Sequence, residues 1–153
     1  MGYYRSLSHK IQTALSFHLS DWSILLRAWV WLLRVDLLLR TRPFARVQVT
    51  MERWSKPRRA LPPEQAWEQI RRYQRFVILA ARLHLYPMRC LRQSLALQVM
   101  LGGQGIATTL RIGVRKEADQ FWAHAWLEYE GQSIELSNSF ESFQPLAPLE
   151  NTP

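Results

Sequence analysis

Two side chains carry the chemistry that stands out in this chain. The only cysteine is Cys90, and His124 follows it thirty-four residues later (124 − 90). A thiol with an imidazole base is the minimum set for nucleophilic catalysis by cysteine. Cys90 follows the helix-breaking Pro87, so we expect it in the first turn of a helix, where the partial positive charge favours the thiolate. Arg89 and Arg92 are its cationic sequence neighbours. A buried, unreactive cysteine is the competing interpretation.

A third side chain is expected to orient the imidazole. His124 lies on a predicted strand that turns back at Glu130-Gly131. If that hairpin loop has two residues, Glu135 is the diagonal neighbour of His124 on the same face. If the loop has three residues, the parity shifts and Asn138 faces His124 instead. We prefer Glu135, because an anion stabilises an imidazolium better than an amide does.

The elements that must position these residues follow from periodicity and from breaks at Pro and Gly. We expect residues 1–18 to be weakly helical at best. Helices are predicted at 20–40, 44–55, 63–84 and 88–102, and strands at 106–115, 120–130 and 132–138. Helices followed by an antiparallel meander predict an α+β fold. The segment KPRRALPPEQ (56–65) separates a helical N-terminal region, 1–60, from a core, 61–153, which together form one continuous domain.

Charge is distributed unevenly along the chain. Residues 1–60 contain eleven Lys/Arg and three Asp/Glu, a net charge of +8, whereas residues 61–153 contain nine of each. Such asymmetry is typical of proteins that bind nucleic acid, membrane surfaces or acidic partners. Solvated helix faces are an equally good interpretation, and Arg71, Arg72 and Arg75 lie off the apolar stripe of their helix, so we expect them to face solvent.

Other classes are disfavoured by the composition. One cysteine excludes an internal disulfide framework and a cysteine-only zinc site, and it fits a reducing compartment. His9, His18 and His84 lack partners at metal-ligand spacing, so no metal or cofactor is predicted. Charged residues interrupt the apolar segment 21–40, which argues against a membrane span. We see no secretory signal and expect a cytoplasmic protein.

The residues around Cys90 and His124 form a longer pattern. Starting at Cys90, the chain reads CLRQSLALQVMLGGQGIATTLRIGV, and FWAHAWLEYEG follows. This order of Cys-Leu-x-x-Ser-Leu-Ala-Leu, Gly-Ile, Gly-Val and Ala-His-Ala-Trp resembles the transglutaminase-like cysteine proteases of lasso-peptide biosynthesis. These are the B proteins that remove the leader from the precursor peptide. The resemblance covers about residues 85–146.

The resemblance implies a papain/transglutaminase-like fold with Cys90 as nucleophile and His124 as base. The family's third member is an Asp on the strand after the histidine, but here that stretch reads Ser-Ile-Glu-Leu-Ser-Asn. Glu135 is the nearest substitute, and Asn138 stays the alternative. The N-terminal region lacks the strand pattern of a leader-binding winged helix. This implies the single-domain type, which needs a separate small leader-binding protein and passes its product to an ATP-dependent lasso cyclase.

Four functions compete on these observations. The first is a cysteine peptidase that cuts between leader and core, with the backbone N–H of Cys90 as one oxyanion donor. A transglutaminase-like acyltransferase would use the same residues with an amine as acceptor. A non-catalytic scaffold on the same fold is favoured by the missing Asp, and a nucleic-acid-binding protein by the basic N-terminal region. We further hypothesise that the basic region docks the leader-binding partner or an acidic part of the precursor.

Overall fold

A computed structural model describes residues 19–57, 59–117, 120–136 and 144–145. The weak helix expected in residues 1–18, the alternative third residue Asn138 and most of the C-terminal tail lie outside this part. The helices are α2 (Leu19–Thr41), α3 (Phe44–Trp54), α4 (Pro63–Arg82) and α5 (Cys90–Gly102). The strands are β1 (Thr109–Glu117), β2 (Gln120–Tyr129), β3 (Gln132–Ile134) and β4 (Gln144–Pro145). The predicted α+β class is confirmed.

Prolines place the helix starts. Pro43 directly precedes α3, and Pro63 occupies the first position of α4, where its missing N–H costs nothing. Glu64 in the first turn and Arg82 in the last turn of α4 complement the helix dipole. The observed helices agree with the predicted ranges to within about two residues at each end. The first strand differs more from its predicted range than the helices do. It begins at Thr109, whereas the prediction placed its start at residue 106.

The sheet is antiparallel, with strand order β3-β2-β1-β4. Leu127 of β2 pairs with Ile134 of β3, which makes the hairpin loop two residues long. Glu130 and Gly131 in this loop have φ of 50° and 77°. Two positive φ angles are the signature of a type I′ turn, whose twist matches that of the flanking strands. The two-residue alternative of the sequence interpretation is therefore correct.

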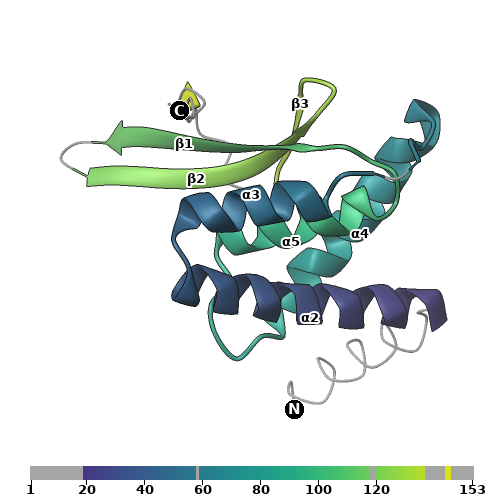
Figure 1. The fold of residues 1–153 in the computed structure, drawn as a ribbon, viewed down its shortest axis with the longest axis horizontal. Helices are drawn as coiled ribbons and strands as arrows, with labels where there is room; N and C mark the ends of the chain where they lie inside the picture. Colours follow the sequence, from purple (N-terminus) through teal and green to yellow (C-terminus); the bar gives the residue numbers. More distant parts are fainter. Residues whose placement is uncertain (1–18, 58, 118–119, 137–143, 146–153) are drawn as a thin grey trace, which may run out of the picture.

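Helix α5 is the centre of the molecule. It lies between the sheet and α2 (Figure 1), and it also packs against α3 and α4. Nine of its residues, from Ser94 to Gly102, are buried. One cluster of buried side chains joins the helices to the sheet and includes Leu32, Met51, Phe76, Leu97, Leu101 and Leu127. The core thus contains residues from both sides of position 60, and the division at that position stays a prediction.

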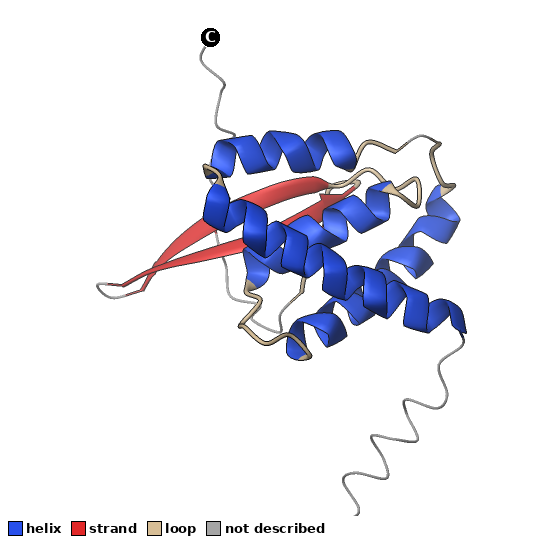
Figure 2. Ribbon diagram, turned by 60° about the horizontal axis from the view of Figure 1, so that its bottom comes forward, coloured by secondary structure: helices blue, strands red, loops and turns tan. Residues whose placement is uncertain are grey.

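Two local features complete the fold. A Cβ atom placed on Gly102 would lie 2.0 Å from the carbonyl oxygen of Ser55, so glycine allows the C-terminal ends of α3 and α5 to meet. The ribbon formed by β1 and β2 projects beyond the helices (Figures 1 and 2). Near its end, Phe121 and Trp122 are exposed by 75% and 51%. No helix in the described ranges is long and apolar enough to cross a membrane.

Candidate active site

Cys90 is the first residue of α5, as its sequence position after Pro87 predicts. It is a free, half-buried thiol. The preceding Arg89 is extended and provides no side-chain cap for the helix. The first N–H groups of a helix have no partner within the helix. Those at the start of α5 can therefore donate to a group that lies beside the Cys90 thiol. The side-chain amide of Gln93 donates to the carbonyl of Met88, which holds the entry to the helix in place.

His124 and Glu135 meet on one face of the sheet. The Nε2 atom of His124 lies 3.2 Å from Oε2 of Glu135, and the two side chains are exposed by only 8% and 20%. The type I′ turn produces this contact, because it makes the two residues diagonal neighbours on adjacent strand segments. The imidazole stacks on Trp126 with ring centroids 5.9 Å apart. Gln74 of α4 donates to the carbonyl of Glu135, which fixes the segment after β3.

A buried hydrogen bond joins the cysteine helix to the histidine strand. The hydroxyl of Ser94 donates to the carbonyl of Ala125 over 3.0 Å. Ser94 lies one helical turn after Cys90, about 6 Å along the axis, and Ala125 directly follows His124. The fold therefore brings the N-terminal part of α5 to the strand segment that carries the imidazole. This arrangement is consistent with a site that contains a nucleophile, a base and a carboxylate that orients the base.

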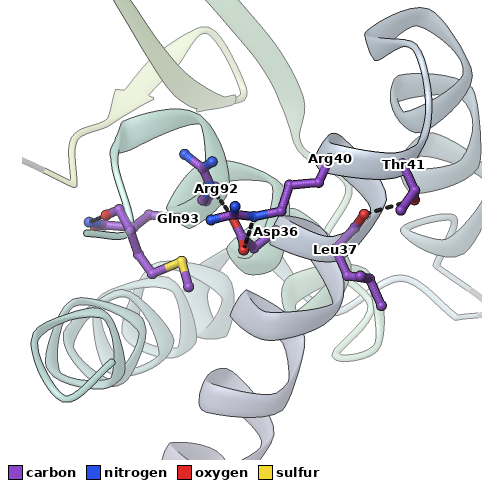
Figure 3. A network of polar contacts seen from close by, with 7 residues as sticks. Asp36, Leu37, Arg40, Thr41, Arg92 and Gln93 are labelled. Atoms are coloured by element: carbon purple, nitrogen blue, oxygen red, sulfur yellow. Dashed lines mark hydrogen bonds and ion pairs between the residues drawn. The ribbon is translucent and has the colours of Figure 1, made fainter. Parts of the chain in front are cut away.

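Arg92 has a different role from the one that its sequence position suggested. Its Nε donates to Oδ1 of Asp36 over 2.6 Å, and Arg40 donates to the other carboxylate oxygen over 2.7 Å. Figure 3 shows Asp36 between the two guanidinium groups. The charge of Arg92 is compensated by this carboxylate, so it is not a free cation beside Cys90. Asp36 and Arg40 are four residues apart, so they form an ion pair along α2.

The surroundings of the Asp36 carboxylate change its pKa. Burial alone would raise its pKa, but hydrogen bonds from Arg40 and Arg92 and their positive charges outweigh that effect, so the pKa of Asp36 lies below its usual value. The carboxylate is therefore ionised at neutral pH. It ties α2 to the first turn of α5, the turn that begins with Cys90.

The structure also contradicts the predicted environment of Arg72. We expected it to face solvent with Arg71 and Arg75, but its guanidinium binds Asp21 over 2.6 Å and the hydroxyl of Ser20 over 3.0 Å. This contact joins the first turn of α2 to α4.

Several positioning residues were not identified from the sequence. Asp36, Gln93 and Ser94 each fix the N-terminal half of α5 through polar contacts. Ser94 and Gln98 are the two polar residues in the buried stretch Ser94–Gly102 of this helix, and they were the available signal. Within the described ranges, no cluster of three or more His, Cys, Asp or Glu side chains could hold a metal ion.

Comparison with known proteins gave one match. The family model described as the transglutaminase-like superfamily matches residues 29–148, which is 120 of the 153 residues (148 − 29 + 1). The matched range contains Cys90, His124 and Glu135. Searches among curated proteins and among solved structures found no match.

Proposed function

The chain belongs to the transglutaminase-like superfamily, and we propose that it is a cysteine peptidase that removes the leader peptide from a lasso-peptide precursor. Cys90 is the nucleophile, His124 the base, and Glu135 the group that orients the base. The observation that carries this proposal is the hydrogen bond between His124 and Glu135, because a buried imidazole held by a carboxylate is what a thiol nucleophile requires. The resemblance of residues 85–146 to lasso leader peptidases supports the choice of substrate.

The reaction is acyl transfer to water in two steps. Glu135 accepts a hydrogen bond from Nε2–H of His124, which leaves Nδ1 as the atom that takes the thiol proton. The Cys90 thiolate attacks the scissile carbonyl at the junction of leader and core. As the C–N bond breaks, the imidazolium gives its proton to the leaving amine, and a thioester remains. His124 then activates a water that hydrolyses the thioester and regenerates the thiol.

The tetrahedral intermediates need hydrogen-bond donors for the oxyanion. The backbone N–H of Cys90 suits this role, because it belongs to the uncapped first turn of α5. The helix dipole adds partial positive charge at the same point. Both effects stabilise the thiolate as well as the oxyanion.

The proposed reaction requires other proteins. As the resemblance to the single-domain type of leader peptidase implies, a separate small leader-binding protein presents the precursor. The released core peptide passes to an ATP-dependent lasso cyclase. The peptidase uses no cofactor or metal, and a reducing cytoplasm keeps its single thiol free.

Mass spectrometry of a lasso precursor peptide incubated with the chain and its leader-binding protein tests the proposal. We expect one cut between leader and core, and none with Cys90→Ala. Because the chain has one cysteine, iodoacetamide should abolish cleavage in step with alkylation of Cys90. Circular dichroism of the Cys90→Ala variant should show an unchanged fold. Retained cleavage by a folded Cys90→Ala variant would refute the proposal.

The same assay separates the competing functions. A peptidase should release the free acid without any added amine, whereas a precursor that is processed only when hydroxylamine is added, to give the hydroxamate, would favour an acyltransferase. If Cys90 reacts with iodoacetamide no faster in the folded chain than in the denatured chain, the thiol is not activated. That result would favour a scaffold protein.

A further inference from the structure

A groove of about 830 Å³ lies at the opposite end of α5 from Cys90. It is formed where the C-terminal ends of α3 and α5 meet the chain that leads into α4. Its walls come from α2, α3, α5 and the segment 56–65, and the residues that line it include Arg27, Trp31, Trp54, Lys56, Arg59 and Met100. Cys90, His124 and Glu135 are not among its lining residues, so it is separate from the candidate active site.

The groove is positively charged. Arg27, Lys56 and Arg59 line it, whereas no Asp or Glu among the described residues does. All three cations are exposed, and within the described part of the chain none of them forms an ion pair. These three residues belong to the N-terminal 60 residues, which hold the whole net charge of the chain. An anionic ligand is therefore the complementary one.

The groove also has an aromatic wall. Trp31 and Trp54 lie with ring centroids 5.7 Å apart at an angle of 57°, and Trp54 is exposed by 47%. Leu61 and Pro62 add apolar surface. Indole rings beside the three cations suit a ligand that combines negative charge with apolar or aromatic groups.

The positions of the cations favour several separate carboxylates over one compact anion. Arg27 belongs to α2, whereas Lys56 and Arg59 belong to the segment after α3. Carboxylates spread along a peptide can reach cations on two elements. The start of α4 also borders the groove through Pro62 and Gln65, and its partial positive charge favours an anionic ligand as well.

We propose that this groove is an exosite that binds an acidic, aromatic-containing segment of the peptide substrate. The proposal rests on the peptidase function argued above. It also predicts a spacing: from Cys90 to Gly102, α5 rises about 18 Å. An extended peptide covers about 3.3 Å per residue. The acidic segment must therefore lie at least five or six residues from the scissile bond.

A binding assay tests this without requiring cleavage. The probe is a fluorescein-labelled peptide of sequence Glu-Glu-Phe-Glu-Glu-Leu, and the protein is the full chain carrying Cys90→Ala. We expect saturable binding by fluorescence anisotropy that weakens with salt. Reversal of the groove cations (Arg27→Glu, Lys56→Glu and Arg59→Glu together) should weaken binding about tenfold or more. The control variant carries Arg42→Glu, Arg46→Glu and Arg71→Glu, which are exposed outside the groove and change the net charge equally. It should bind more tightly than the groove variant.

Each other outcome has a defined meaning. Equal weakening in both triple variants, no binding, or equal binding of the peptide with Lys in place of Glu would overturn the exosite. Tighter binding of fluorescein-labelled oligothymidylate, lost in the groove variant alone, would also overturn it, in favour of a nucleic-acid surface. If the peptide binds as expected but no precursor is cleaved, the proposed peptidase fails while the groove keeps its ligand class. If cleavage occurs, the groove variant should raise KM and leave kcat unchanged.

Discussion

The carboxylate beside His124 belongs to a glutamate, one methylene longer than the aspartate that the family resemblance implies. Glu135 reaches the imidazole diagonally from the segment after β3, and its backbone carbonyl is held by Gln74 of α4. A glutamate has one more rotatable bond than an aspartate, so this second anchor matters for holding the carboxylate in place. At the scale of single residues, the proposed site therefore depends on two contacts of Glu135, one by its side chain and one by its backbone.

The orienting role of Glu135 leads to a kinetic prediction. Glu135→Gln keeps the size of the side chain but removes the negative charge that stabilises the imidazolium formed in the reaction. We expect kcat for precursor cleavage to fall by about 10²-fold with KM little changed, because the charge is needed only during proton transfer. Glu130→Gln in the exposed turn is the matched control and should retain full activity. A Glu135→Gln variant with unchanged kcat would exclude this role.

Residue-scale prediction from sequence succeeded where the contact is local and failed where it is not. The pairing of His124 with Glu135 follows from the two-residue turn, because strand parity fixes which side chains share a face. Asp36 and Arg92 are 56 residues apart, and no periodicity links them. The sequence showed only that Arg92 is close to Cys90 along the chain, and that proximity suggested a role that the ion pair contradicts.

At the scale of elements, α5 connects the candidate active site to the groove. Its first residue is Cys90, its second turn binds the histidine strand through Ser94, and its last residue, Gly102, lies at the edge of the groove. Helix α2 fixes the orientation of α5 through the ion pair of Asp36 with Arg92. Loss of that pair would leave the position of this turn to the hydrogen bonds of Gln93 and Ser94 and to apolar packing.

Asp36→Asn tests this connection. The variant loses the charge that binds Arg40 and Arg92, and we expect the free energy of unfolding at pH 7 to fall by about 1–3 kcal/mol. The pKa of Asp36 is lowered in the folded chain, so its contribution is present above the unfolded value of about 3.9 and is lost as the pH falls through the folded value. Urea unfolding followed by tryptophan fluorescence measures the difference between wild type and variant.

The pH dependence supplies the contradicting outcome. The difference between wild type and Asp36→Asn should shrink as the pH falls below about 4, because both chains then carry a neutral group at this position. A difference that stays constant into the acid range would mean that shape rather than charge stabilises the contact. Glu68→Gln on the exposed face of α4 is the control, and it should change the free energy of unfolding by less than about 0.5 kcal/mol.

At the scale of the whole molecule, the N-terminal helices are part of the framework of the site. Helix α2 and helix α3 bury Leu32, Val35, Val47 and Met51 against the same core that holds α5 and the sheet. The order of elements and the α+β class could be predicted from periodicity and from Pro and Gly breaks. The central place of α5 could not, because its buried stretch contains the polar residues Ser94 and Gln98, and the partner of Ser94 is 31 residues away along the chain.

A single shared core predicts that destabilising α2 also affects the candidate active site. Leu32 is fully buried, and Leu33 beside it is exposed by 45%. Leu32→Ala should lower the free energy of unfolding by about 2–5 kcal/mol through the cavity that it leaves, whereas Leu33→Ala should cost less than about 0.5 kcal/mol. If residues 1–60 and 61–153 fold as one unit, urea should unfold the Leu32→Ala variant in a single transition. Tryptophan fluorescence and the reactivity of Cys90 with thiol reagents should change together in that transition. Two separate transitions in urea would instead show that the N-terminal helices unfold independently, and that the site persists without them.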